Sequence, residues 1–315
     1  MTILSTKKII TTVILFILFY VLFAAYSDID KIKENYQQIN TIYLIPMLGI
    51  LTLSIFLRSL LQRFLLQKIN IKLSVKQNFF LFWSGLSMLI TPGGSGQMIK
   101  SHYIKKLYGQ PISKSLPLVF AERFYDFLAL ILIVTVSTFF FTRLETLFIT
   151  IVSIAILTAI FLCIKSVKFL NKTKSIMGKI PIFKKTIDQI PQFDYSLQRL
   201  FEIKIIGVGC LMAITSFFLE GFVIYLGFLA FDINLGYLQT IQIFYTSVLF
   251  GTLSFIPGGV GVLEATFANM LIQKNFELSL ITSLIILIRL TTTWYATLTG
   301  FIVSYVVFLW KKVVN

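Results

Sequence analysis

The sequence predicts an all-α polytopic membrane protein, a single membrane domain made of six crossing helices and two re-entrant helical hairpins of opposite orientation. Three observations lead to this fold class: the apolar composition, a glycine motif that occurs twice, and the placement of the basic residues. Hydrophobic residues make up 57% of the 315 residues and charged residues only 13%, with a mean hydropathy of +0.88. Soluble domains are about half apolar and about a quarter charged, so this chain is expected to lie in lipid.

Apolar stretches of about 20 residues are long enough to span a hydrocarbon core about 30 Å thick as helices. The predicted crossing helices cover residues 9–26, 41–61, 115–141, 144–164, 204–231 and 278–310. The first follows Lys7 and Lys8 as in a signal peptide, but the sequence around Ala25 is a poor cleavage site, so we expect a membrane helix. The last is long for one span, and Gly300 is expected to bend it.

The motif Pro-Gly-Gly-x-Gly stands at Pro92–Gly96 and again at Pro257–Gly261. Each copy follows an apolar run and precedes a short helical segment, and the arms on either side are shorter than a full span. We therefore expect two re-entrant hairpins, over residues 78–107 and 238–273. Backbone groups freed by such a break at membrane depth must be buried in protein or line a polar cavity. Two breaks at corresponding positions indicate a substrate site between two repeats.

The basic residues predict the topology. If the N-terminus is cytoplasmic and both hairpins return to the side from which they enter, 22 of the 28 lysine and arginine residues are cytoplasmic, four are outside and two lie in the membrane. Cytoplasmic loops of membrane proteins carry such an excess. Three crossings then separate equivalent helices of the two halves, residues 1–141 and 142–315, so the halves are expected to form an inverted repeat. Single broken crossings in place of the hairpins would put basic loops on both sides.

Residues 165–203 are predicted to form a basic cytoplasmic loop that contains Pro181 and Pro191. Its apolar side chains favour a position on the inner leaflet surface, although a solvated linker fits the sequence equally well. The net charge of +15 comes mostly from loops of this kind, so anionic lipid headgroups are the expected partners and nucleic acid is not.

Glu122, Arg123 and Asp126 lie within the third predicted crossing helix. Ionisable groups at membrane depth are costly, so they are functional candidates. Glu122 and Asp126 share one helix face because they are four residues apart, and Arg123 can pair with Asp126 at three residues apart. The group either locks its helix to neighbouring helices through ion pairs, or binds or gates a substrate.

Arg289 lies in the last helix with no acid nearby on that helix, so its partner is expected to be Glu122, Glu264 or an anionic substrate. Glu264 stands at the start of the second short helix, where its carboxylate either favours the positive helix end or takes part in the site. Lys100, on the first short helix, is expected to face headgroups or substrate, or else to be an ordinary interfacial lysine. Glu220 is expected to hydrogen-bond between helices.

The two glycine turns are predicted to bind an anion. Turns of this kind leave amide N–H groups unpaired ahead of a helix start, and such groups can cradle a phosphate. The turns and the charged residues near them form the predicted substrate-binding set. Its members are Pro92, Gly93, Gly94, Gly96, Gln97, Lys100, Glu122, Arg123, Asp126, Pro257, Gly258, Gly259, Gly261, Glu264 and Arg289.

Nothing in the sequence indicates catalysis. The chain has no metal-ligand spacing, no G-x-S-x-G motif and no nucleotide-binding loop. Its single histidine, His102, has no companion motif and is expected at the membrane interface. Cys163 and Cys210 are too far apart to suggest a disulfide framework or a metal cluster. We therefore expect no catalytic residue, no metal and no cofactor.

These motifs resemble the transmembrane region of the lysylphosphatidylglycerol synthases and the related flippase-like integral membrane proteins of bacteria and archaea, over nearly the whole chain. Gln97 departs from that family, which usually has glutamate there, so a role that needs a charge at this position, such as proton coupling, is in question. The chain ends at Asn315 without a soluble aminoacyl-transferase domain, so lipid aminoacylation is not expected. The residues that carry the resemblance are Pro92–Gln97 with Lys100, then Glu122, Arg123 and Asp126, then Pro257–Glu264 and Arg289, with Arg58 and Arg63 near the second helix.

The resemblance implies translocation of a lipid, such as an aminoacylated phospholipid or a polyprenyl-linked sugar or phosphate. Our leading hypothesis is a flippase of a prokaryotic cytoplasmic membrane with both termini in the cytoplasm. Its two inverted halves would hold an anionic or lipid-linked headgroup near the midplane, in a pocket with a positive interior. Two alternatives stay open: an ion-coupled secondary transporter of a small anion, and a membrane partner of a separate lipid-modifying transferase. A homo-oligomer is also open.

Overall fold

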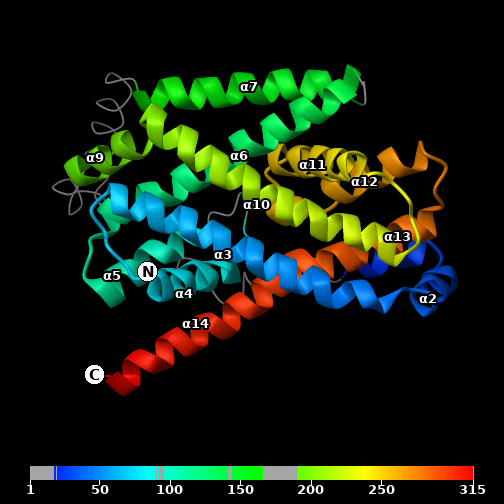
Figure 1. Ribbon diagram of the computed structural model, residues 1–315, viewed down its shortest axis with the longest axis horizontal. Coiled ribbons are helices and arrows are strands. Elements are labelled where there is room, and N and C mark those ends of the chain that lie inside the picture. Colours follow the sequence, from blue (N-terminus) through cyan, green and yellow to red (C-terminus); the bar gives the residue numbers. More distant parts are fainter. Residues whose placement is uncertain are drawn as a thin grey trace.

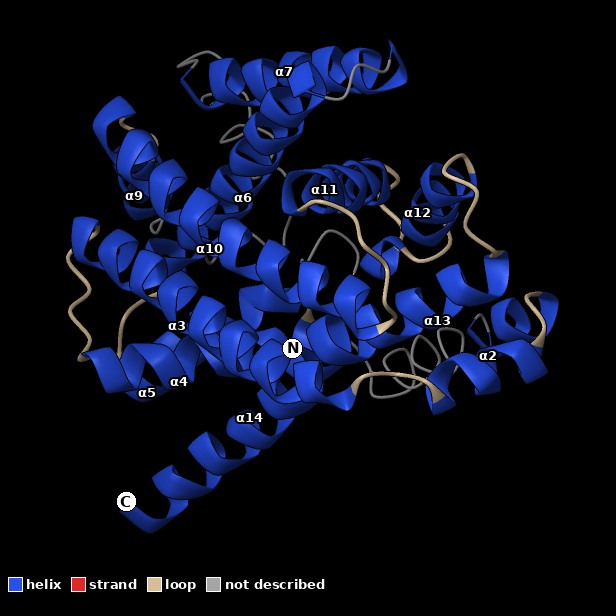
Figure 2. Ribbon diagram, turned by 45° about the vertical axis from the view of Figure 1, so that its right-hand side comes forward, coloured by secondary structure: helices blue, strands red, loops and turns tan. Residues whose placement is uncertain are grey.

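The computed structural model describes residues 18, 20–89, 91, 96–140, 144–165 and 190–314. Within these ranges every regular element is a helix and there is no strand, which confirms the all-α fold class (Figures 1 and 2). The predicted crossing helix at 9–26 lies outside the described residues except at 18 and 20–26. Among the described residues, the helices long and apolar enough to cross a membrane are Thr41–Lys68, Ile203–Ala230 and Leu278–Val306, and Ile151–Leu162 is a shorter apolar helix.

The first half contains two long helices and, between them, the two short arms of the predicted hairpin 78–107. A helix that includes residues 20–26 precedes them. The short arms α4 and α5 lie on either side of the first glycine motif. The bounds are α2 (Ile29–Gln37), α3 (Leu44–Lys68), α4 (Val75–Gly85), α5 (Ile99–Tyr108) and α6 (Ile112–Phe140).

The second half repeats this order of long and short helices. The arms α11 and α12 correspond to the predicted hairpin 238–273, and the second glycine motif connects them. The bounds are α7 (Leu144–Lys165), α9 (Ile190–Leu200), α10 (Ile203–Ala230), α11 (Tyr237–Leu253), α12 (Val262–Ile272), α13 (Leu278–Arg289) and α14 (Tyr295–Val314).

The helix α9 corrects the prediction that residues 165–203 form a loop, of which residues 166–189 lie outside the described part. Pro191 is the second residue of α9, and proline is tolerated in a first helical turn because the N–H it lacks would have no helical partner there. Leu197 and Leu200 are buried and α9 packs against α6, while Tyr195 is exposed. The tolerated proline made this amphipathic helix easy to miss.

The short helix α2 was also not predicted, and it docks on α13. Its start is capped by Asp28, whose side chain accepts a hydrogen bond from the amide of Lys31. Tyr36 donates its hydroxyl proton to the Ser283 carbonyl at 2.9 Å, and Asn35 donates to the Ser283 hydroxyl at 3.2 Å. Burial raises the pKa of Tyr36 above its ordinary value, so the hydroxyl stays protonated and able to donate.

The last predicted helix is interrupted, but not at Gly300. The helices α13 and α14 are joined by a π-helical segment, Leu290–Trp294, which follows Arg289 directly. The hydroxyls of Thr291 and Thr292 donate to the carbonyls of Leu287 and Ile288 four residues earlier. Side-chain bonds of this kind compete with the backbone ladder, and π-helical turns are frequent at functional sites.

Each hairpin packs on the last long helix of the other half. The first arm of the first hairpin, α4, lies along α14, and the first arm of the second hairpin, α11, lies along α6. The helices α3 and α10 pack along each other in the middle of the molecule (Figure 1). Two further contacts between the halves also match: α2 of the first half packs on α13 of the second, and α9 of the second half packs on α6 of the first. The two halves are therefore interleaved rather than placed side by side.

Gly300 is the point at which α14 approaches the first hairpin. A Cβ atom added there would lie 2.5 Å from the amide nitrogen of Ser87 and 2.9 Å from the carbonyl oxygen of Trp83. Nearby, the hydroxyl of Ser304 donates to the Ser84 carbonyl at 3.0 Å. The Trp83 indole donates to Thr299 at 2.9 Å. Glycine at 300 thus serves a close backbone approach.

Replacing Gly300 by alanine is expected to destabilise the protein. The new methyl group would press on the backbone of the first hairpin, and overpacking of this kind costs about 1–3 kcal/mol. The measurement is the midpoint of thermal unfolding in detergent. The control is Gly207→Ala in α10, where nothing lies within 4 Å of an added Cβ. Alanine is the better helix former by about 1 kcal/mol, so the control should be unchanged or more stable. Equal midpoints for the two variants would contradict the close approach.

Candidate functional site

The buried ion pair between Lys100 and Glu122 joins the short helix α5 to the long helix α6. The two side chains are only 1% and 5% exposed. Gly85 makes room for the lysine stem, because a Cβ at that position would lie 2.6 Å from the Cγ and Cδ atoms of Lys100. The ammonium group also lies 5.1 Å from the ring centre of Phe82. The alternative that Lys100 is an ordinary interfacial lysine is therefore wrong, because a carboxylate of the next helix holds it inside the protein. A contact of Lys100 with a substrate stays a prediction.

Asp126 is shared by two arginines. Arg123 lies 3.0 Å from one carboxylate oxygen, as predicted from their spacing, and Arg58 of α3 lies 3.3 Å from the other. Arg123 also donates to the side-chain oxygen of Gln97 at 3.3 Å, so this bond links the start of α5 to α6. The guanidinium of Arg58 lies over the ring of Phe217, 4.6 Å from its centre. We call Arg58, Gln97, Lys100, Glu122, Arg123 and Asp126 the first-half cluster.

The first-half cluster reaches the protein surface and is incompletely paired. The side chain of Arg123 is 33% exposed, whereas those of Arg58 and Asp126 are 18% and 15% exposed. Four buried polar atoms have no hydrogen-bond partner among the described residues. They are the Nε atoms of Arg58 and Arg123, Nε2 of Gln97 and Oε1 of Glu122. Such atoms lose hydration without compensation, which favours a polar ligand.

The corresponding charged residues of the second half, Arg289 and Glu264, are buried and paired with each other. Arg289 donates to Oε1 of Glu264 through Nε at 2.8 Å, and its Nη2 lies 2.7 Å from the same oxygen. The side chains are 9% and 1% exposed. Tyr20, from the N-terminal helix, donates to the same carboxylate oxygen at 2.7 Å. Arg289 donates further to the carbonyl of Gly258 at 3.2 Å and to Thr293 at 3.4 Å. We call these five residues the second-half cluster.

The partner required for Arg289 is therefore Glu264, one of the three possibilities that the sequence left open. Both halves join the short helix after the glycine turn to the next long helix by charge, α5 to α6 and α12 to α13. The signs are exchanged, because the first half has the base on the short helix and the second half has the acid there. The second-half cluster leaves Arg289 little freedom to meet a substrate.

The second glycine turn needs its glycines. Gly258, Gly259 and Gly261 have φ angles of 61°, 66° and 87°, a region that other residues rarely adopt. A Cβ at Gly259 would also lie 3.1 Å from the Cα of Gly251 in α11. The turn therefore packs its backbone directly against that of α11.

The amide groups of this turn correct the prediction of an anion cradle. The amide of Gly259 donates to the carbonyl of Ile256, and that of Val260 donates to Pro257. The amide of Gly261 donates to Oε2 of Glu264 at 2.8 Å. These three groups are used within the protein, and the Glu264 carboxylate supplies the negative charge at the start of α12.

At the first glycine turn, Pro92, Gly93 and Gly94 lie outside the described residues. The amide of Gly96 donates to the hydroxyl of Thr91 at 2.7 Å. A side chain on Gly96 would crowd Thr91 and Met88. The prediction that the two turns meet in one pocket stays a prediction.

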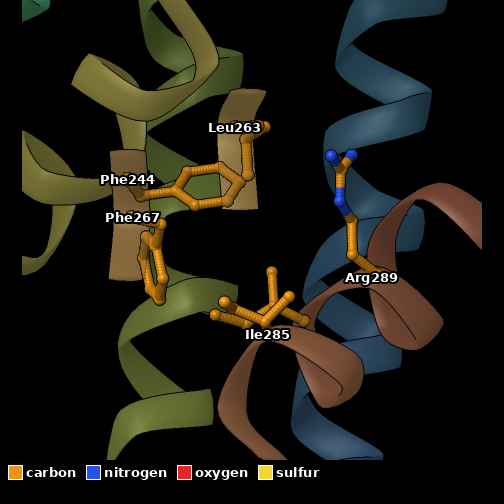
Figure 3. A pocket seen from close by; sticks show the side chains of 6 residues that line it. Phe244, Leu263, Phe267, Ile285 and Arg289 are labelled. Atoms are coloured by element: carbon orange, nitrogen blue, oxygen red, sulfur yellow. The ribbon is translucent and has the colours of Figure 1, made fainter. Parts of the chain in front are cut away.

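A small pocket borders Arg289, with an empty volume of about 190 Å³ that includes open solvent. Figure 3 shows Phe244, Leu263 and Phe267 on one side, Arg289 on the other and Ile285 between them. Apart from Arg289 the lining is apolar, so this pocket offers a polar headgroup a single charged group, one that Glu264 already neutralises. The first-half cluster is the better candidate for a ligand. Among the described residues, no three His, Cys, Asp or Glu side chains are grouped to hold a metal ion.

Replacing Glu264 by glutamine is expected to lower the thermal unfolding midpoint strongly. The change leaves the Arg289 guanidinium buried without a carboxylate, and breaking a buried pair in this way costs about 3–5 kcal/mol. The matched control is Glu277→Gln, which removes the exposed pair with Lys31, whose side chains are 71% and 54% exposed. A pair of that kind contributes at most about 1 kcal/mol. Similar midpoints for both variants would show that the second-half cluster is not closed.

Comparisons with known proteins agree with the motifs. A UPF0104 membrane protein of Methanothermobacter thermautotrophicus is 26% identical over 228 residues, which cover 67% of this chain and 67% of that protein. A UPF0104 membrane protein of Methanocaldococcus jannaschii is 25% identical over 221 residues, 69% of this chain and 92% of that protein. Residues 9–300, which include both glycine turns and both clusters, match the family described as the lysylphosphatidylglycerol synthase TM region. The chain is therefore a membrane protein that belongs to the lysylphosphatidylglycerol synthase TM region family.

Proposed function

We propose that this protein is a lipid translocase that moves the headgroup of a phospholipid or a polyprenyl-linked lipid across a prokaryotic cytoplasmic membrane. The observation that carries the proposal is the first-half cluster, a partly exposed group of charges with unpaired buried atoms in a chain built of apolar helices. Charged side chains in such surroundings are costly and commonly mark a substrate pathway. A headgroup would supply the missing hydrogen bonds while its acyl chains stay in the lipid.

In this proposal the two halves are inverted repeats, with six crossing helices, two re-entrant hairpins and both termini in the cytoplasm. The repeated order of helices and the matched packing of α4 on α14 and α11 on α6 support it. The excess of basic residues on one side supports the orientation. Transporters with inverted repeats commonly work by rocking one repeat against the other around a fixed site.

The two clusters take different roles in the proposed mechanism. Arg58 and Arg123 contact the headgroup, because they combine partial exposure with unpaired donors, and the buried Gln97 adds a further unpaired donor beside them. The pair of Arg289 with Glu264 holds the second hairpin in place and neutralises its own charge. Because each hairpin packs on the last helix of the other half, a headgroup that moves α6 through Arg123 would also move α11.

Replacing Arg123 by glutamine is expected to reduce lipid movement at least about tenfold, which corresponds to the loss of one hydrogen bond to a charged group. The measurement is the accessibility of a fluorescent phospholipid to an impermeant quencher in proteoliposomes. The control is Arg199→Gln in α9, an exposed arginine paired with Glu202, which should keep normal rates. Thermal unfolding of both variants checks that they are folded.

Normal lipid movement in the folded Arg123→Gln variant would contradict the proposed site. Uptake of a soluble anion by the wild-type protein, without any movement of lipid, would contradict the proposed function itself.

A further inference from the structure

The ionisable groups around the first-half cluster balance one another. Glu220 of α10 lies near Arg58 and, counted in its ionised form, adds one negative charge. The basic residues are Arg58, Lys100 and Arg123, and the acidic residues are Glu122, Asp126 and Glu220, so among the described residues the formal charges sum to zero. A ligand with a net charge would bring that charge into an apolar protein without compensation.

The unpaired atoms of the cluster include both donors and an acceptor. The donors are the Nε groups of Arg58 and Arg123 and the Nε2 group of Gln97. The acceptor is Oε1 of Glu122, whose other oxygen is taken by Lys100. A phosphate would satisfy the donors but leave the Glu122 oxygen beside a second negative charge. A ligand that satisfies all four atoms must carry an acceptor group and a donor group together.

The four atoms are themselves buried, but the side chains that carry them differ in exposure. Glu122 is 5% exposed at its side chain, whereas Arg58 and Arg123 are 18% and 33% exposed. The acceptor is therefore carried by the more buried side chain of the cluster, and the arginine donors are carried by the more exposed ones. In a phospholipid with an amine headgroup, the ammonium is the far end of the headgroup and the phosphate lies next to the glycerol and acyl chains. With the acyl chains in the lipid, such a headgroup would enter with its ammonium foremost.

We propose that the first-half cluster binds a zwitterionic phospholipid headgroup with a phosphate and a protonated primary amine, an inference that rests on the proposed translocase function. The ammonium donates a hydrogen bond to Oε1 of Glu122. The phosphate oxygens accept hydrogen bonds from Arg123 and Arg58, and Gln97 donates between the two ends. The headgroup carries no net charge, so the balance of the cluster is kept.

The test places the full-length protein in nanodiscs with equal amounts of phosphatidylethanolamine, phosphatidylcholine and phosphatidylglycerol. The lipids that stay bound on gentle release are counted by native mass spectrometry. Phosphatidylcholine has the same charges as phosphatidylethanolamine but no N–H donor, and phosphatidylglycerol has a phosphate but no cation. We expect phosphatidylethanolamine to be enriched about tenfold over phosphatidylcholine, the effect of one hydrogen bond to a charged group. Equal retention of these two lipids, or a preference for phosphatidylglycerol, would overturn the inference.

Two variants locate the selection in the cluster. Glu122→Gln combined with Lys100→Met removes the carboxylate without leaving the buried ammonium unpaired, and it should lower retention of phosphatidylethanolamine to that of phosphatidylcholine. Gln97→Met keeps every ion pair but removes the Nε2 donor and the hydrogen bond that Gln97 accepts from Arg123. It should therefore weaken the binding of all three lipids while the ratio of phosphatidylethanolamine to phosphatidylcholine stays unchanged. An unchanged preference in the folded double variant would overturn the role of Glu122. If the double variant does not fold, two measurements still test the inference. They are the ratio of retained phosphatidylethanolamine to phosphatidylcholine in the wild-type protein and the same ratio in Gln97→Met.

The outcomes also separate this inference from the proposed function. A protein that moves fluorescent lipid but prefers phosphatidylglycerol is a translocase with a different headgroup. A protein that moves no lipid at all contradicts the function, whichever lipid it retains.

Discussion

A charged side chain between apolar helices must find an opposite charge within hydrogen-bond distance, because neither lipid nor an apolar core can solvate it. This constraint organises both halves of the molecule. Lys100 meets Glu122 across α5 and α6, and Arg289 meets Glu264 across α12 and α13. Each pair holds the short helix after a glycine turn against the next long helix. The backbone break at each turn is thereby followed at once by a buried tertiary contact.

The two halves satisfy the same constraint to different degrees. In the second half, Glu264 uses both oxygens and Arg289 uses all three of its nitrogens, so little capacity is left for a ligand. In the first half, Gln97 and Lys100 follow the glycine turn, and Asp126 is divided between two arginines. That arrangement leaves donors and an acceptor unused. The second-half cluster is thus fully paired and the first-half cluster is incompletely paired. Only the first-half cluster has the features of a binding site.

Because the two halves are interleaved, the first-half cluster is connected to the rest of the protein by direct packing of helices. Its residues lie on α3, on α5 and the turn before it, and on α6, which also contacts the first arm of the second hairpin. On the opposite side, α14 supports the first arm of the first hairpin through contacts with no room for a side chain at Gly300. The π-helical turn that joins α13 to α14 follows Arg289 directly, so this turn connects the second-half cluster to α14. Movement in one half is therefore transmitted to the other by direct packing.

By itself, the sequence determined the all-helical membrane class, the limits of α6, α7 and α10 to within three residues, and the place of the two Pro-Gly-Gly breaks between short helices. Apolar length and Pro-Gly-Gly breaks act locally, so they can be recognised without knowing what surrounds them. The pairing of Arg123 with Asp126 was equally predictable, because three residues along a helix lie on one face. Only the tertiary structure decided which distant charges meet: Lys100 with Glu122, Arg58 with Asp126, and Arg289 with Glu264 and Tyr20. Tyr20 and Glu264 are 244 positions apart, and no local pattern relates such residues until packing brings their helices together.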